Sequence, residues 1–513
     1  MPALAQDLKW GPHIDLEAKP GSKRSLGEAD LFVPLLQNAD TLLFGSFRAR
    51  MDDQESSEGN YGLGLRHMLG SGWNLGAYGY FDRRRTEYGN HFHQATFGLE
   101  ALSQDWDLRA NYYAPVGRRS HRIDSLNTAT ISGATVMVRG GEERSMGGFD
   151  AEIGWRVPLF DAKAEQQFRV YGGGYRFSES GVPDISGPRA RAELTFDSVP
   201  GLWEGSRFSL GAEWQHDEPR GSQGFLTARL RIPLQVYGKP ASRLTPMERR
   251  MADPVVRDVD VVTRAGSFGA PEVATANGGV VTVLSSGSTV GADLPNAVAA
   301  AGNNSTVILT GTFDLTTGII LQSGQTVMGA GTLQVRSPSG RTAVLAAPGA
   351  TVTSSVSGTS AFSMAQDATL SGIVTSSVDA QAVDASGTTN ATIINNRLTS
   401  VASGGAPSMG ITANAAANIT IRNNVISVSS TGGVSSATAL DLFAVTNALV
   451  AGNTITATAA GGANAYAVSL DSSNLAAGSV GNRLGTGNAG GCNTQNNGSG
   501  FLGYANAPDC NAF

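Results

Sequence analysis

Two aspartates in the second half of the chain have a spacing that acid–base chemistry could use. Asp384 and Asp441 occupy the same position of a repeating pattern, two repeats apart. If the repeats stack as parallel coils, these carboxyl groups lie roughly 10 Å apart, at the upper end of the separations of about 5 to 10 Å that a glycoside hydrolase needs. Thr412 holds the intervening position, and Asp471 falls two positions later in the next repeat. We predict that Asp384 and Asp441 are solvated surface residues, and we keep catalysis by this pair as the alternative.

The composition around them offers little further chemistry. From Gly266 to Phe513 there are nine acidic residues and five arginines, and no lysine or histidine. A lyase needs a basic group that removes a proton, and often a carboxylate cluster for calcium. We therefore predict no enzyme activity, no cofactor and no metal site. A surface-anchored polysaccharide hydrolase or lyase stays as the alternative, because many parallel β-helices of the pectin lyase-like fold act on acidic polysaccharides.

The two cysteines of the chain, Cys492 and Cys510, are separated by 17 residues near its end. In an oxidising compartment this spacing suits one disulfide that closes a short loop, which stabilises by ~3 kcal/mol. Two free buried thiols are the alternative.

The composition changes abruptly near residue 265. All six histidines, all five lysines and all six tryptophans precede it, and a half rich in Gly, Ala, Ser, Thr and Asn follows. The net charge of −6 and the pI near 5.6 give no reason to expect a nucleic-acid partner. No apolar run is long enough for a transmembrane helix, but barrel strands are short and alternate.

Residues 10–235 contain segments of about ten residues in which apolar and polar side chains alternate, as in Phe149–Val157. We count twelve, which predicts a closed, even-stranded antiparallel barrel with an apolar outer face. The polar faces would line its lumen with Arg48, Arg50, Arg109, Glu152, Arg156, Arg189, Arg191, Glu213, Arg229 and Arg231.

Two further patterns favour a membrane barrel over a soluble all-β domain. Long polar connections, such as Arg118 to Ala134, alternate with short ones, such as Leu69 to Gly72, as in outer-membrane proteins. Aromatic residues sit near segment ends and suit interfacial girdles. They are Trp10, Trp73, Trp106, Trp203, Tyr112, Tyr113 and Tyr237.

A short helix is predicted after the last barrel segment. Thr245 and Glu248 have the spacing of a capping box, Pro246 takes the first helical position, and Pro254 ends the helix. Arg249 and Arg250 on this helix would face lumen carboxylates such as Glu152 or Glu213. An ordinary interdomain helix outside the barrel is the alternative.

The second half contains a repeat of 28 to 29 residues. One asparagine recurs at positions 396, 424, 453 and 482 and follows a short β segment each time. Such units bury no face alone, so they predict a stacked, right-handed parallel β-helix with an asparagine ladder. A helix at Asp293 to Gly302 would cap the first coil, and Ala343 to Leu345 would belong to an early coil. A disordered low-complexity stalk is the alternative.

Several motifs of the first half resemble a known family. They run from Leu43-Phe44-Gly45 through Asn60 to Arg66, Gly79-Tyr80-Phe81-Asp82, Gly98-Leu99-Glu100 and Ala110 to Pro115. In this order they resemble the β-domain of intimin/invasin-type inverse autotransporters, over roughly residues 10 to 265. The resemblance implies a twelve-stranded outer-membrane barrel that exports the segment following it, with Met247 to Val261 as the linker in the pore. The second half shows no immunoglobulin-like or lectin-like repeats.

The expected organisation has four parts. Residues 1–9 are a signal-peptide remnant, indicated by Ala3-Leu4-Ala5, or a disordered start. Residues 10–235 form the transmembrane barrel, 236–265 the pore-occupying linker and 266–513 the β-helix passenger.

We expect an inverse autotransporter in the outer membrane of a Gram-negative-type bacterium that displays its passenger outside the cell as an adhesin. The expected partners are outer-membrane lipid, the barrel-assembly machinery, periplasmic chaperones and a host-cell, matrix or glycan ligand for the passenger, and the barrel is expected to be monomeric. A channel with an appended soluble domain is a further alternative.

Overall fold

The computed structural model describes residues 9–197, 199, 201–234, 244–257, 260–404, 406–431, 435–460, 465–486 and 494–496, and most of them lie in strands. The chain forms two compact units. The first contains Met1–Leu126 and Gly141–Phe268, and the second contains Asn127–Gly140 and Gly269–Phe513. The described residues include no helix that is both long and apolar enough to cross a membrane.

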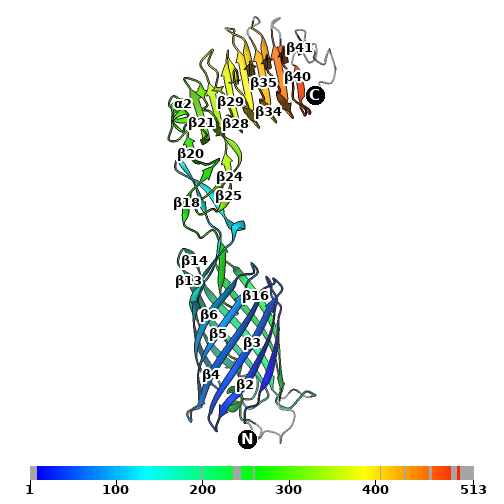
Figure 1. Cartoon of the computed structure of the whole chain (residues 1–513). Helices are drawn as coiled ribbons and strands as arrows, with labels where there is room; N and C mark the ends of the chain where they lie inside the picture. Colours follow the sequence, from blue (N-terminus) through cyan, green and yellow to red (C-terminus); the bar gives the residue numbers. More distant parts are fainter. Residues whose placement is uncertain are drawn as a thin grey trace. The chain divides into compact units, whose positions relative to one another are not determined.

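The first unit contains a closed antiparallel barrel, and this confirms the predicted all-β class and the twelve strands (Figure 1). Strand β1 pairs with both β2 and β16, which closes the sheet and removes its edges. The strands are β1 His13–Lys19, β2 Leu26–Gln37, β3 Thr41–Asp52, β4 Ser57–Met68, β5 Trp73–Arg85, β6 His91–Ser103, β7 Trp106–Val116, β12 Gly147–Val157, β13 Gln166–Glu179, β14 Val182–Asp197, β15 Arg207–Asp217 and β16 Gly221–Pro233.

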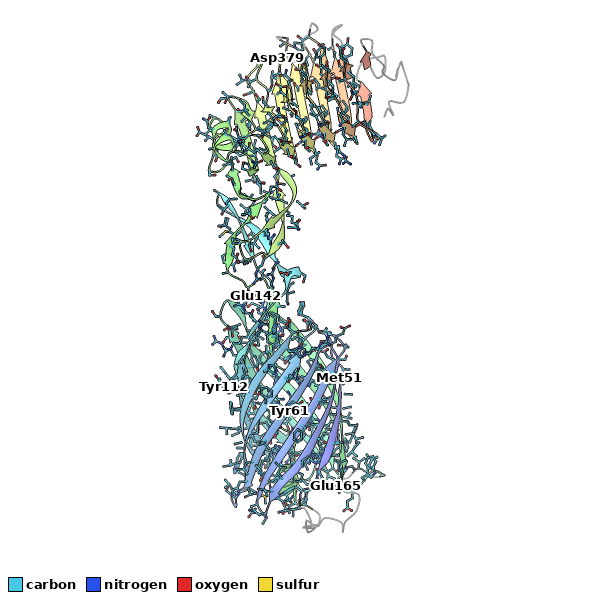
Figure 2. All side chains as sticks on the ribbon, in the orientation of Figure 1. Met51, Tyr61, Tyr112, Glu142, Glu165 and Asp379 are labelled. Atoms are coloured by element: carbon cyan, nitrogen blue, oxygen red, sulfur yellow. The ribbon has the colours of Figure 1, made fainter. Side chains whose placement is uncertain are left out.

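Alternation sorts the barrel side chains into two faces. Met51, Tyr61 and Tyr112 lie on the outside of the wall, as Figure 2 shows, together with many other large apolar residues. Asp82, Asn74 and many other polar residues of the barrel strands are buried inside. The outer surface is therefore suited to hydrocarbon and the interior to charged groups.

Two of the expected girdle aromatics lie inside instead. Trp10 and Tyr113 are each 1% exposed. The Trp10 indole donates a hydrogen bond to the carbonyl of Glu248, and the Tyr113 hydroxyl donates one to Asp150. Each ring thus finds a polar partner in the lumen, a partner that hydrocarbon does not offer.

The connections at the two ends of the barrel differ from the expected alternation of long and short loops. One end, here called the turn end, carries the short turns 38–40, 69–72 and 104–105, and also the longer β12–β13 and β14–β15 connections, 158–165 and 198–206. The other end, the loop end, carries the long connection 117–146, but Ser180-Gly181 and 218–220 there are as short as the turns. The long connection is itself folded. It contains β8 Ser120–Arg122, the 3-10 helix Asp124–Leu126, β9 Thr128–Ser132, β10 Thr135–Arg139 and β11 Glu142–Ser145.

This long connection belongs to both units. In the first unit, β11 pairs with β8 and with β17 (Thr263–Gly266). The β9–β10 hairpin, by contrast, falls in the second unit. Residues 127–140 are therefore part of the second unit, although sequence alone assigned them to the barrel range.

The second unit consists mainly of stacked parallel strands, as expected for a β-helix (Figure 1). One sheet contains β20 Gly279–Ser285, β21 Thr306–Leu315, β23 Thr326–Met328, β28 Thr369–Ser371, β31 Thr392–Ile394, β34 Thr420–Arg422 and β37 Leu449–Ala451. A second extends from β21 through β26 Ala350–Ser354, β29 Ile373–Val378, β32 Arg397–Ala402, β35 Val425–Ser430, β38 Thr454–Ala459 and β40 Arg483–Thr486. The third contains β22 Ile319–Ile320, β27 Phe362–Ser363, β30 Gln381–Asp384, β33 Ser408–Asn414, β36 Ala437–Phe443, β39 Ala465–Asp471 and β41 Thr494–Asn496.

The predicted asparagine ladder is present in the core of these coils. The amide of Asn396 donates to Asn424 Oδ1 at 3.0 Å, that of Asn424 to Asn453 at 3.0 Å, and that of Asn453 to Asn482 at 2.9 Å. Each ladder oxygen also accepts the backbone N–H of the asparagine one coil earlier. One buried side chain per coil thus satisfies two donors of its neighbour.

The early coils depart from the repeat. The expected helix is present as α2 (Leu294–Ala300), and its Leu294 and Val298 are buried in the same core. Ala343 to Leu345 lie in an antiparallel hairpin of β24 (Ala330–Arg336) and β25 (Thr342–Pro348), not in a coil. The short strands β18 (Pro271–Val273) and β19 (Thr275–Ala276) precede β20.

Candidate functional site

The barrel lumen is occupied by the chain that follows β16. Helix α1 (Pro246–Arg250) lies near the turn end and carries the predicted capping box between Thr245 and Glu248. The Trp10 indole donates to the Glu248 carbonyl at 2.7 Å, and the Lys9 ammonium lies 2.7 Å from its carboxylate. The Asn74 amide donates to the carbonyl of Met247. These contacts bind the first turn of this short helix.

Beyond the helix, wall arginines bind the linker backbone and its carboxylates. Arg66 donates to the carbonyls of Met251 and Asp253, at 2.9 and 2.7 Å. The Asp253 carboxylate in turn accepts from Arg207 at 2.6 Å. The guanidinium of Arg250 lies 2.6 Å from Asp107. Backbone carbonyls and charged side chains of the linker are therefore both paired.

The linker is bound in the same way further along. Arg257 forms two contacts of 3.0 Å with Asp82, and both side chains are almost fully buried. Asp260 is bound by Arg24 through two hydrogen bonds of 2.8 and 3.0 Å and by Arg84 at 2.9 Å. These bidentate contacts fix geometry as well as charge.

At the loop end the linker leaves the lumen through apolar side chains. The backbone N–H of Met146 donates to the carbonyl of Val262 at 2.9 Å. Val262 packs in a buried cluster with Met146, Tyr113, Phe177 and Ile185. The linker then continues as β17, paired with β11. The described parts of the linker, 244–257 and 260–268, thus contact the wall from the turn end to the loop end.

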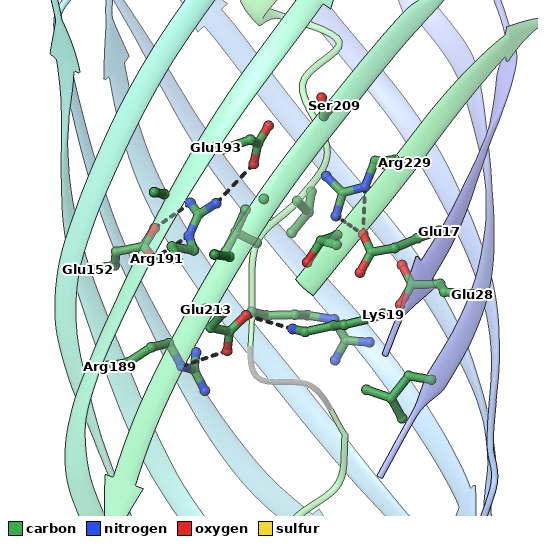
Figure 3. A pocket seen from close by; sticks show the side chains of 18 of the residues that line it. Glu17, Lys19, Glu28, Glu152, Arg189, Arg191, Glu193, Ser209, Glu213 and Arg229 are labelled. Carbon is green, nitrogen blue, oxygen red and sulfur yellow. Dashed lines mark hydrogen bonds and ion pairs between the residues drawn. The ribbon is translucent and has the colours of Figure 1, made fainter. Parts of the chain in front are cut away.

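The wall across from these contacts pairs its charges with itself. A cavity of about 90 Å³ lies beside the linker and is lined mainly by Arg, Lys and Glu (Figure 3). Arg191 forms two contacts of 2.7 Å with Glu152, and Lys19 lies 2.6 Å from Glu213. A cavity of this size and polarity has room for several water molecules.

The comparisons with known proteins bear on this barrel. Residues 10–171, from before β1 into β13, match the family model of the inverse autotransporter β-domain. The barrel is an inverse autotransporter β-domain. Such a β-domain lies in the outer membrane, which agrees with the apolar outer wall. No curated protein matches the chain.

Solved membrane proteins resemble the chain more distantly. One from a study of the mechanism of in-meso crystallization is 14% identical, with a TM-score of 0.37, and covers 50% of this chain and 100% of its own. An outer membrane channel from Pseudomonas putida F1 is 9% identical, with a TM-score of 0.31, and covers 45% and 97%. The KdgM porin is 8% identical, with a TM-score of 0.25, and covers 42% and 97%. Scores this low support no functional assignment.

The structure places most of the suggested lumen residues of this β-domain inside the wall. Arg48 and Arg50 pair with Glu28, Arg109 with Glu152 and Asp107, Arg189 with Glu213, Arg229 with Glu17, and Arg231 with Asp15. Arg156 differs, because it pairs with the half-exposed Asp105 at the turn end.

The expected partners of the helix arginines were wrong. Arg250 binds Asp107, and Arg249 lies 3.7 Å from Asp197, so neither meets Glu152 or Glu213. Those two glutamates are already neutralised by wall cations. The sequence also gave no role to Asp253, Arg257 or Asp260. The sequence pattern that could have identified these residues is a charged residue every few positions after the last strand. Such a pattern indicates a linker in a charged lumen.

The candidate catalytic pair lies on β30 and β36 in the second unit. Asp384 is in register with Thr412, and Thr412 with Asp441, as the repeat predicted. Burial raises the pKa of Asp441, while a hydrogen bond with Ser469 opposes the rise. The described residues contain no group of three or more metal-ligating side chains. Cys492, Cys510 and Tyr237 lie outside the described residues.

Proposed function

We propose that this β-domain exports the C-terminal β-helix through its own lumen and displays it on the cell surface, where it acts as an adhesin. The observation that carries the proposal is the path of the linker. It runs from α1 at the turn end to Val262 at the loop end, and the wall binds it along the way. A chain that entered the lumen from one side and left on the other would end in this arrangement.

The composition of the second unit suits a passenger of this kind. The β-helix contains no lysine or histidine and few charges, and its core consists mainly of Ala, Val, Leu and Ile together with the asparagine ladder. Each coil buries its apolar face on the one before it. Folding outside the cell would therefore favour outward movement of the chain without an external energy source.

Surface exposure is tested on intact cells. An epitope tag after Phe513 should react with antibody on unpermeabilised cells, and proteinase K should remove it without reaching a periplasmic marker. If the tag reacts only after permeabilisation, export is wrong and a channel with an appended periplasmic domain takes its place.

The adhesin role needs a separate measurement. Cells that express the full chain should bind host cells, matrix or glycan surfaces better than cells that express residues 1–268, at equal amounts of folded barrel. Equal binding by both would contradict display for adhesion while leaving export intact.

A further inference from the structure

The β9–β10 hairpin is encoded within the barrel sequence, between β7 and β12, yet it belongs to the second unit and pairs with strands there. Strand β10 runs antiparallel to β18, with Met137 opposite Val273 and Arg139 opposite Pro271. The N–H of Gly269 donates to the carbonyl of Gly140 at 2.9 Å, and that of Ala274 to Val136 at 2.8 Å. The first residues of the second half thus pair with a strand that is encoded more than a hundred residues earlier in the sequence.

The same hairpin covers the first edge of the parallel β-helix. Strand β20 pairs on one side with β21 in parallel. On its other side, the N–H of Val283 donates to the carbonyl of Ala134 at 2.8 Å, and Thr135 pairs with Thr282. An uncovered first strand would expose a row of unpaired backbone groups. On that side β20 also pairs with β19, with Thr275 opposite Val280 and Ala276 opposite Gly279, so β10 and β19 together form the terminal cap that a solenoid needs.

The hairpin also contributes to a core. Val136 and Val138 are fully buried, whereas Thr135, Met137 and Arg139 beside them are partly or fully exposed. They pack in one cluster with Val281, Val283 and Ile308 of the first coils. This cluster also includes the β24–β25 hairpin, and it is separate from the long core of the later coils. The start of the β-helix thus has a core of its own, completed by two valines from the barrel sequence.

The linker pairs with the long connection before it reaches this hairpin. In the first unit, β17 pairs with β11, from Thr263 opposite Ser145 to Gly266 opposite Glu142. A few residues on, in the second unit, Pro271 is opposite Arg139. The order is the same along both segments: residues 263–266 pair with 145–142, and residues 271–273 then pair with 139–137. The first pairing therefore brings the right residues to β10 for the second.

We propose that the β9–β10 hairpin is a built-in folding template whose β10 edge receives residues 269–283 as they leave the lumen and starts the first coil. The inference rests on the proposed export. The hairpin is encoded before β12, so it is present once the barrel has closed, whereas β18 and β20 follow the linker. The edge of β10 is then ready when its partners arrive, and it remains in place as part of the cap.

The test uses the full chain on cells and follows how fast the passenger becomes resistant to proteinase K after a pulse of synthesis. The variant Val136→Asp/Val138→Asp places two charges in the first core. Its matched control, Thr128→Asp/Thr130→Asp, adds the same charges at exposed positions of β9. Heat-modifiable migration reports whether the barrel has folded, and the C-terminal tag reports surface arrival.

We expect both variants to give a folded barrel and a surface-reactive tag. The valine variant should acquire resistance severalfold more slowly than wild type, while the threonine control should match wild type. If the valine variant loses the folded barrel, Val136→Ala/Val138→Ala replaces it and should still slow the step.

The outcomes separate the two proposals. Equal rates in the valine variant and in its control would overturn the template while leaving export standing. A wild-type tag that never reacts on intact cells would instead overturn export, and the template with it.

Discussion

The barrel lumen and the β-helix core solve the same problem, a buried polar interior, in opposite ways. In the lumen each contact is made once, as between Arg257 and Asp82 or between Arg84 and Asp260. In the β-helix one contact, the amide of Asn396 on Asn424, recurs on the next coils. Unique ion pairs suit a linker that must stop at one position. A repeated neutral contact suits coils that must add in series.

The largest effect should follow removal of the unique contacts as a group. Deletion of Thr245 to Asp253 removes α1 together with Arg250 and its ion pair with Asp107. The reconstituted barrel should change from nearly closed to continuously conducting in planar bilayers. Arg249→Ala is the control, because the contact of Arg249 with Asp197 is long and its loss keeps the helix. A deletion variant that conducts like wild type would show that the linker does not seal the pore.

A single lumen charge should matter next. Asp107 is fully buried and faces Arg109, Arg169 and Arg250. Asp107→Ala leaves these cations with less countercharge and should cost about 3–5 kcal/mol of barrel stability. Asp105→Ala, at a half-exposed pair with Arg156, should cost only about 0–1 kcal/mol. The measurement is the urea midpoint for loss of heat-modifiable migration, and similar midpoints would contradict the role given to lumen charge.

The repeated contact should have a smaller, local effect. Asn424→Ala leaves the backbone N–H of Asn396 without its acceptor and should cost about 1–3 kcal/mol of passenger stability. Asn423→Gly is the matched control. Asn423 is exposed with a φ of 56°, and glycine already stands at the equivalent corner as Gly452, with a φ of 65°. Pulse proteolysis in urea compares the stability of the two variants. Equal stability would show that the ladder does not stabilise the core.

The smallest effect concerns a rare charge of the β-helix. Burial raises the pKa of Asp441 above its usual 3.8, so the folded state takes up a proton more readily than the unfolded state. Stability should therefore fall as the pH rises through the interval above 3.8. Asp441→Asn should remove this slope and slightly stabilise the passenger at neutral pH. Unfolding midpoints from pH 4 to 7 test this, and an unchanged slope would assign it to other groups.

Sequence alone predicted what depends on local pattern. Alternation in segments such as Phe149–Val157 gave the strands and their faces, and Thr245 with Glu248 gave the cap of α1. The period at Asn396, Asn424 and later positions gave the ladder. The strands and the cap of α1 depend on residues that are close in sequence, and the ladder depends on a regular repeat. Each can therefore be recognised from the sequence.

Contacts between distant segments were beyond such reasoning. The partner of Arg250 depends on how far the linker extends along the lumen, and no local pattern encodes that distance. The hairpin itself had a signal, since β-branched residues alternate on both sides of Gly133. Its partners, however, lie more than a hundred residues later. Trp10 was misplaced because an aromatic residue at a strand end suits either a girdle or a polar lumen.

The position of β9–β10 bears on how such a protein can be recombined. A fusion made at the compositional break near residue 265 would keep the barrel together with this hairpin and attach a foreign passenger. The valines at positions 136 and 138 would then face side chains that they were not selected to contact. The passenger is thus encoded in two separate segments, 127–140 and 269–513. A functional passenger exchange must therefore replace residues 127–140 as well.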